Sequence, residues 1–122
     1  MTIKTISRAI IPSSKKAAMM LAVLCFTAAL PGLVSAAQYE IIIENHRFVP
    51  QQLEVTAGEK HRLIIINKDA TPEEFESYEL NREKIVAGNS KIIIFLPPLD
   101  AGIYPFFGEF NEATAQGRLL VK

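Results

Sequence analysis

The residue types best suited to chemistry in this sequence are carboxylates. Glu73, Glu74 and Glu76 stand in one short acidic segment, and Glu109 and Glu112 stand in another segment near the C-terminal end. Carboxylate oxygens are the ligands that hard or intermediate cations take in proteins, whereas cuprous ion takes sulfur and imidazole. A run of glutamates on a loop is most often a solvated surface, so these residues form a candidate cation site only if the fold brings both segments together.

The two histidines, His46 and His61, offer the only imidazole ligands. His46 stands close to Phe48, at the end of a strand-like segment, and joins the candidate ligands. His61 begins a strand that should start at the opposite end of the domain, so we expect it at the surface. The two histidines lie on different elements without a cysteine partner, which excludes a zinc finger. The sequence also contains no phosphate-binding glycine loop and no Ser/His/Asp order with supporting context.

The N-terminal region has the three parts of a secretory signal. The stretch "MTIKTISRAIIPSSKK" is basic, "AAMMLAVLCFTAAL" is an apolar run, and Ser35, Ala36 and Ala37 are small residues at the place where a signal peptidase would cut. The apolar run is shorter than the roughly 20 residues that cross a bilayer. We therefore predict a signal peptide at 1–37, cleavage after Ala36 or Ala37, a domain at 38–122, and a periplasmic location.

Removal of this signal changes the chemistry of the chain. The only cysteine, Cys25, and all three methionines lie within it. A blue-copper centre needs a thiolate, so the remaining domain is excluded as a type 1 copper protein. All 13 acidic residues remain, but four of the 13 basic residues leave, which gives the domain a formal net charge of −4. This acidity argues against nucleic acid as a partner.

Short strands must position the candidate ligands. Segments rich in β-branched and aromatic residues alternate with turn formers, which predicts a small antiparallel β-sandwich. The predicted strands are 39–44, 53–55, 61–67, 91–96, 103–107 and 118–121.

The segment 67–84 does not follow this strand pattern, because it is long, polar and acidic. We expect an ordered loop there with one short helical turn within 70–82. Thr71 suits a helix N-cap, and Glu73 and Glu74 suit the first turn of a helix. Within this loop, Glu79 and Glu83 are expected to be solvated and to pair with neighbouring basic side chains.

Several spaced residues are similar to those of the cupredoxin family. The resemblance runs from Tyr39 to Val121, so it covers nearly all of the predicted domain. It implies a Greek-key β-sandwich with a metal site at one pole. The residues that carry the resemblance are Phe48-x-Pro50, Val55-x-x-Gly58, Asn67-x-Asp69, Tyr104-x-Phe106 and Gly117-x-Leu119-x-Val121.

Three further stretches, "TPEEFES", "NREK" and "GEFNEATAQG", resemble the periplasmic cupredoxin-like proteins encoded with bacterial iron permeases (the EfeO-type cupredoxin domain). In that group the last stretch usually has a histidine where Asn111 stands. The resemblance puts the first copper histidine of blue-copper proteins at Glu73, the copper cysteine at Gly108, the second histidine at Asn111, and the methionine near Thr114.

The pole of the implied fold is formed by three loops, at 44–47, 69–82 and 108–116. Oxygen ligands replace sulfur and imidazole there, so the resemblance implies an iron site, with copper as the other candidate metal. The implied metal ligands are Glu73, Glu74, Glu76, Glu109, His46 and Glu112.

The resemblance implies an accessory protein of ferrous or ferric iron uptake. Such a protein would bind iron, assist its oxidation in a ferroxidase-like role or only carry it, and deliver it to an inner-membrane iron permease, as a monomer or a weak dimer. Two alternatives stay open. One is a metal-free binding module whose acidic loop docks on a basic membrane or periplasmic partner, and the other is a non-blue copper carrier.

Overall fold

The computed structural model describes residues 28–32 and 35–122. The chain divides into two units, 1–32 and 33–122, and every strand lies in the second. Most of the predicted signal, namely 1–27 and 33–34, lies outside the described residues. Among the residues that are described, none belongs to a helix long and apolar enough to cross a membrane.

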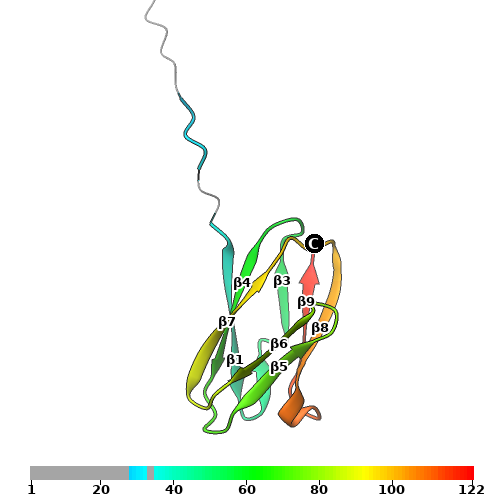
Figure 1. Ribbon diagram of the computed structural model, residues 1–122. Helices are drawn as coiled ribbons and strands as arrows, with labels where there is room; N and C mark the ends of the chain where they lie inside the picture. Colours follow the sequence, from blue (N-terminus) through cyan, green and yellow to red (C-terminus); the bar gives the residue numbers. More distant parts are fainter. Residues whose placement is uncertain (1–27, 33–34) are drawn as a thin grey trace, which may run out of the picture. The chain divides into compact units, whose positions relative to one another are not determined.

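Within the described residues, nine strands form two sheets (Figure 1). The four-stranded sheet has the order β2-β1-β4-β7, and the five-stranded sheet has the order β3-β9-β8-β5-β6. The strands are β1 (Ala37–Glu44), β2 (Arg47–Val49), β3 (Gln52–Val55), β4 (His61–Asn67), β5 (Glu73–Ser77), β6 (Arg82–Val86), β7 (Ser90–Leu96), β8 (Gly102–Gly108) and β9 (Gln116–Val121). A 3-10 turn, η1 (Glu109–Asn111), follows β8 directly.

The predicted β-sandwich is confirmed, with one difference in strand direction. Most neighbouring strands are antiparallel, but β1 pairs with β4 and β3 pairs with β9 in parallel. Each of these pairs joins strands that are not consecutive in the chain. Such parallel neighbours need a crossover connection rather than a tight hairpin.

The predicted helical turn within 70–82 is wrong, because this segment forms the β5–β6 hairpin. The side chains of Glu73, Phe75 and Ser77 face the interior, whereas Glu74 and Glu76 alternate onto the other face. This two-residue alternation is that of a strand and not of a helix. Because glutamates lie on both faces of this strand, the sequence does not show the usual alternation of apolar and polar residues.

Three aromatic rings form the centre of the core between the sheets. Phe48, Phe75 and Phe106 are fully buried, and the Phe106 ring lies 5.0 Å from the Phe48 ring and 5.1 Å from the Phe75 ring, measured between centroids. Phe106 was expected in the core, and this is confirmed. These rings join β2, β5 and β8, the last of which leads into the turn η1.

The side chains of Asn67 and Asp69 hold the β1–β2 turn and the segment that precedes β5 by hydrogen bonds. The Asp69 carboxylate accepts hydrogen bonds from the backbone N–H groups of Asn45 (2.8 Å) and His46 (2.9 Å), both of which have positive φ in the β1–β2 turn. The bond from the His46 N–H is the main cause that holds the pKa of Asp69 below its ordinary value. The Asn67 amide donates to the carbonyl oxygen of Thr71 at 2.8 Å.

His61 was expected at the surface, but it is buried, with 1% of its area exposed. Its Nε2 atom lies 2.7 Å from the carbonyl oxygen of Thr56, and its ring packs edge-on against Tyr39. The expectation failed because β1 begins at Ala37, which pairs with His61 and covers it.

Candidate metal centre

Four glutamates from three elements meet on the outward face of the five-stranded sheet. Glu74 and Glu76 come from β5, Glu83 from β6 and Glu109 from η1, and one carboxylate oxygen of each lies within 4.8 Å of the others. We call these four residues the carboxylate cluster. Its members meet because Glu76 is paired with Glu83 in the hairpin, while the pairing of Phe75 with Gly108 brings η1 beside β5.

Like charges dominate the carboxylate cluster. Glu76 has only 9% of its area exposed, and its carboxylate has no hydrogen-bond donor among the described residues. The residue directly opposite is Glu83, and like charges at paired positions destabilise a sheet. No basic side chain of residues 28–32 or 35–122 forms an ion pair with the cluster, since the pairs present there are His46–Asp69 and Lys122–Glu54.

Mutual repulsion is visible in the pKa values of the carboxylate cluster. The pKa of Glu74 is raised to about 7, chiefly by a hydrogen bond shared with the Glu83 carboxyl group, with desolvation and the charge of Glu109 adding to it. The pKa of Glu76 is also raised, first by desolvation and then by the charges of Glu83 and Glu109. At neutral pH Glu74 is therefore partly protonated, and a cation could displace this proton.

A hollow of about 340 Å³ opens beside the carboxylate cluster and is lined in part by Glu76, Tyr78 and Glu83. Arg82 also lines it, but its guanidinium group donates to the carbonyl oxygens of Phe95 and Asn81 and is thereby held away from an ion pair. The Tyr78 ring packs on Phe107 at 5.5 Å. The carboxylates are therefore open to solvent on one side and bordered by aromatic rings on the other.

The fifth acid of this region, Glu73, faces the opposite way and is 1% exposed. Its Oε1 atom accepts hydrogen bonds from the backbone N–H groups of Glu74 (3.0 Å) and Phe110 (2.9 Å). Its Oε2 atom accepts a hydrogen bond of 2.7 Å from the Asn111 side-chain amide. We call this arrangement the Glu73–Asn111 lock.

Gly108 leaves the space that Glu73 fills. A Cβ atom at this position would stand 2.6 Å from Cδ of Glu73 and 2.7 Å from Cβ of Ala115, closer than real contacts allow. The backbone N–H of Gly108 donates to the carbonyl oxygen of Ala115 at 2.9 Å, which closes the β8–β9 connection at the same point.

Comparison with known proteins places the chain in a family. Residues 17–121 match the family model described as a cupredoxin-like domain. The chain belongs to the cupredoxin-like domain family. An uncharacterized protein of Rickettsia prowazekii (strain Madrid E) is 50% identical over 84 residues, which cover 69% of this chain and 67% of that protein.

Solved structures show the same fold at low identity. Auracyanin A, a blue copper protein from Chloroflexus aurantiacus, has a TM-score of 0.63 and 15% identity and covers 72% of this chain and 100% of that chain. A purple cupredoxin from Nitrosopumilus maritimus has a TM-score of 0.55 and 20% identity, covering 70% and 99%. The metal-binding domain of the Streptococcus pneumoniae D39 Cu(I)-exporting P-type ATPase CopA has a TM-score of 0.60 and 14% identity, covering 70% and 84%.

Type 1 copper does not fit the pole of this cupredoxin-like protein. The residues that the resemblance puts at the positions of its ligands are Glu73, Gly108, Asn111 and Thr114, and none carries sulfur or imidazole. The Glu73–Asn111 lock fills the space beside Gly108, and the Thr114 hydroxyl donates to the carbonyl oxygen of His46 at 2.6 Å. The polar groups of Glu73, Asn111 and Thr114 are therefore already hydrogen-bonded within the protein.

Three of the six predicted ligands, Glu74, Glu76 and Glu109, come together in the carboxylate cluster. Glu73 is turned into the interior. His46 lies in the β1–β2 turn with its Nδ1 atom 3.6 Å from Asp69 Oδ2, and Glu112 caps the C-terminal end of η1; neither belongs to the cluster.

Glu83 is exposed, as expected of a solvated residue, but sequence reasoning missed that it is part of the carboxylate cluster. The available signal was the two-residue alternation in "EEFES", which puts Glu74 and Glu76 on the face opposite to Phe75. A hairpin partner for that strand would have brought Glu83 of "REKIV" to the same face.

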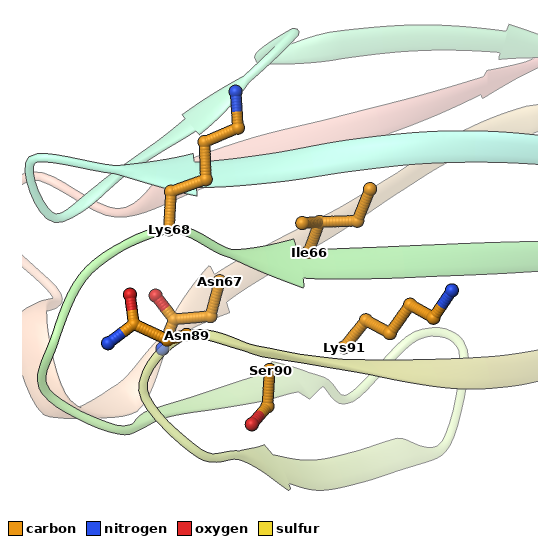
Figure 2. Close-up of a pocket in the computed structure, with 6 residues that line it drawn as sticks. All are labelled: Ile66, Asn67, Lys68, Asn89, Ser90 and Lys91. Atoms are coloured by element: carbon orange, nitrogen blue, oxygen red, sulfur yellow. The ribbon is translucent and has the colours of Figure 1, made fainter.

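A second hollow, of about 440 Å³, lies where β4 ends and β7 begins (Figure 2). Its lining residues carry ammonium, amide, hydroxyl and alkyl groups but no carboxylate or imidazole, and the Lys68 and Lys91 side chains extend in different directions. This hollow therefore offers only neutral oxygen atoms beside two ammonium groups, which disfavours a cation. It is lined by Ile66, Asn67, Lys68, Asn89, Ser90 and Lys91.

Substitution of Gly108 by alanine is expected to lower the free energy of unfolding by about 1–3 kcal/mol, the usual cost of forcing a methyl group into a filled interior. The added Cβ must displace Glu73 or Ala115. Chemical denaturation measures the effect, with Gly102→Ala as the control, because a Cβ there meets only a Tyr104 ring atom at an ordinary 3.6 Å. Equal stability of the two variants would contradict the packing described.

The stability of the metal-free protein is expected to fall as the pH rises from 5 to 8. Because the pKa of Glu74 is raised from 4.5 to about 7, the folded protein binds more protons than the unfolded chain in this window, and deprotonation costs it stability. The raised pKa of Glu76 acts in the same direction, whereas the lowered pKa of Asp69 acts below this window.

Thermal unfolding followed by circular dichroism in the presence of a chelator measures this pH dependence. Glu83→Gln should reduce it, because Glu83 is the main cause of the shift at Glu74. A midpoint that is as high at pH 8 as at pH 5 would contradict the electrostatics of the carboxylate cluster.

Proposed function

We propose that this cupredoxin-like protein binds a hard metal cation, iron in particular, at the carboxylate cluster. The observation that carries the proposal is the meeting of four carboxylates, those of Glu74, Glu76, Glu83 and Glu109, of which Glu76 has only 9% of its residue area exposed. Burying unpaired carboxylates is costly unless a cation or a proton compensates them. A cation that binds there would relieve this cost and the mutual repulsion of the four carboxylates, which supports the proposal.

The donor set indicates which cation. Four carboxylates from rigid strands and one short turn offer oxygen only, which suits Fe²⁺, Fe³⁺, Mn²⁺ or Ca²⁺ and disfavours cuprous ion. Four negative charges stabilise Fe³⁺ more than Fe²⁺. A ferrous ion bound here would therefore lose an electron to an acceptor such as dioxygen more easily than a free ion.

The finer role that we propose is that of an exported accessory of iron uptake, which holds iron for delivery to an inner-membrane permease. The signal-like residues 1–37 support export, and β1 begins at Ala37, so cleavage after Ala36 would leave the first strand whole. The resemblance of "TPEEFES" and "GEFNEATAQG" to the EfeO-type cupredoxin domains supports iron and the permease.

A second candidate function is docking to a basic partner without a metal. It is favoured by exposed apolar side chains beside the carboxylate cluster, since Tyr78 is 75% exposed and Ile85, the cross-strand partner of Glu74, is 56% exposed. Acidic groups bordered by aromatic and aliphatic side chains are a usual composition for a binding surface that recognises basic residues.

Anaerobic calorimetric titration of the purified protein with Fe²⁺, Cu²⁺ and Ca²⁺, followed by exposure of the iron-loaded sample to oxygen, separates these functions. The proposal predicts saturable Fe²⁺ binding at micromolar concentration or tighter and faster oxidation of bound than of free Fe²⁺. Absence of binding by any of the three ions would overturn the metal function and favour docking. Tight Cu²⁺ binding without any effect on Fe²⁺ oxidation would instead indicate a non-blue copper carrier.

A further inference from the structure

The Glu73–Asn111 lock joins the two segments that supply most of the carboxylate cluster. On one side, Glu73 is the first residue of β5 and bonds the N–H of Glu74. On the other side, it bonds the N–H of Phe110 and the side chain of Asn111, two of the three residues of η1. Glu109, the remaining residue of η1, is a member of the cluster.

The lock is fully satisfied although it is buried. The Glu73 carboxylate forms no ion pair with a basic side chain in the described part of the chain, and three N–H donors at 2.7–3.0 Å compensate its charge instead. Hydrogen bonds to an ionised acceptor are among the stronger ones in proteins. Their loss would leave a buried acceptor unpaired, which costs more than the bond itself contributes.

The lock also depends on a particular space. Only the absence of a side chain at Gly108 allows the Glu73 carboxylate to reach η1, because a Cβ atom would stand 2.9 Å from its Oε1 atom. The turn itself has no side-chain cap at its N-terminal end. Among the contacts of the described residues, the Glu73 carboxylate is therefore the principal polar anchor of η1 to β5.

We propose that Glu73 and Asn111 are positioning residues of the cation site. The lock occupies the place that type 1 copper has in the resemblance. It holds Glu109 at the distance from Glu74 and Glu76 at which all three can bind one ion. Glu73 itself does not touch the ion. This inference rests on the proposed cation function.

The test uses variants that keep the net charge of the protein unchanged. Asn111→Leu removes the donor while keeping a similar side-chain size. The double variant Glu73→Gln/Asn111→Asp reverses the bond, because the new amide donates and the new carboxylate accepts. Electrostatic attraction of a cation to the whole protein is therefore alike in all three proteins, and any difference in affinity reports on geometry.

Two quantities are measured: the affinity for Mn²⁺ by calorimetry, and hydrogen exchange of the Phe110 amide by NMR in the metal-free protein. Asn111→Leu is expected to speed exchange at Phe110 and to weaken Mn²⁺ binding about tenfold or more. The double variant is expected to restore both. Exchange at Ile65, which is fully buried in β4, should stay unchanged and serves as the control for general unfolding.

Unchanged Mn²⁺ affinity in Asn111→Leu, or a double variant as impaired as the single one, would overturn the positioning role. Equal acceleration at Ile65 and Phe110 would overturn it as well, because the residues would then serve general stability. If the unmodified protein binds no Mn²⁺ but the Phe110 exchange follows the expected order, the cation function fails while the lock between β5 and η1 stands.

Discussion

Glu83→Gln is expected to weaken Mn²⁺ or Fe²⁺ binding about tenfold to a hundredfold, although Glu83 lies on β6 and not on β5 or η1. Even residues that only support metal ligands cost about this much when they are replaced, so a direct ligand should cost at least the lower figure. Glutamine keeps the size of the side chain and removes only its charge. Glu83 is paired with the buried Glu76, and one carboxylate oxygen of each lies within 4.8 Å of those of Glu74 and Glu109.

Glu79→Gln is the matched control. Glu79 carries the same charge in the turn that joins β5 to β6, but it is exposed and does not belong to the carboxylate cluster. Calorimetric titration at low and at physiological ionic strength should show no more than about a twofold change for this variant. Equal losses for Glu79→Gln and Glu83→Gln would show a diffuse acidic surface in place of a site.

Phe106→Ala is expected to lower the free energy of unfolding by about 3–5 kcal/mol, the usual cost of removing a buried phenylalanine ring. The Phe106 ring is fully buried and contacts the rings of Phe48 and Phe75, so its loss opens a cavity at the centre of the core. A domain of this size has only about 5–15 kcal/mol of stability in total. The variant should therefore be partly unfolded near body temperature.

Phe95→Ala is the control for this substitution. The same ring is removed from the neighbouring sheet, where Phe95 is 61% exposed and has Arg62 over its face at 5.5 Å. A loss within about 1 kcal/mol is expected there, since exposed cation–π contacts contribute about 0.5–1 kcal/mol. Denaturant unfolding of both variants measures the two losses of stability. A similar loss in both would contradict the placement of Phe106 in the core and of Phe95 at the surface.

The general fold could be predicted from the sequence because two signals indicate its apolar strands: their composition and the turn residues between them. Runs such as "EIIIE" and "RLIII" have few alternatives to a strand packed between two layers. The β5–β6 hairpin could not be predicted in this way, because its outward face is acidic and its composition is that of a loop. The burial of His61 could not be predicted either, because it depends on the pairing of His61 with β1, which is a tertiary contact.

The candidate site could be predicted in part. The acidic segments around Glu74 and Glu109 were correctly expected to meet, since the Tyr104–Phe106 and Asn67–Asp69 spacings carry the fold that joins them. The direction of each side chain could not be read in the same way. Glu73 and Glu74 are neighbours with the same chemistry, yet one is locked in the interior and the other faces the carboxylate cluster, because successive residues of a strand alternate between faces.

Paramagnetic broadening of backbone NMR signals by substoichiometric Mn²⁺ tests the cation site most directly, because the effect falls steeply with distance from the ion. The account predicts that the amides of Glu74, Glu76, Glu83 and Glu109 broaden first, while those of His46 and Glu54 stay sharp until much more metal has been added. Broadening centred on His46 and Asp69, or equal broadening beside every exposed carboxylate, would contradict a cation site at the carboxylate cluster.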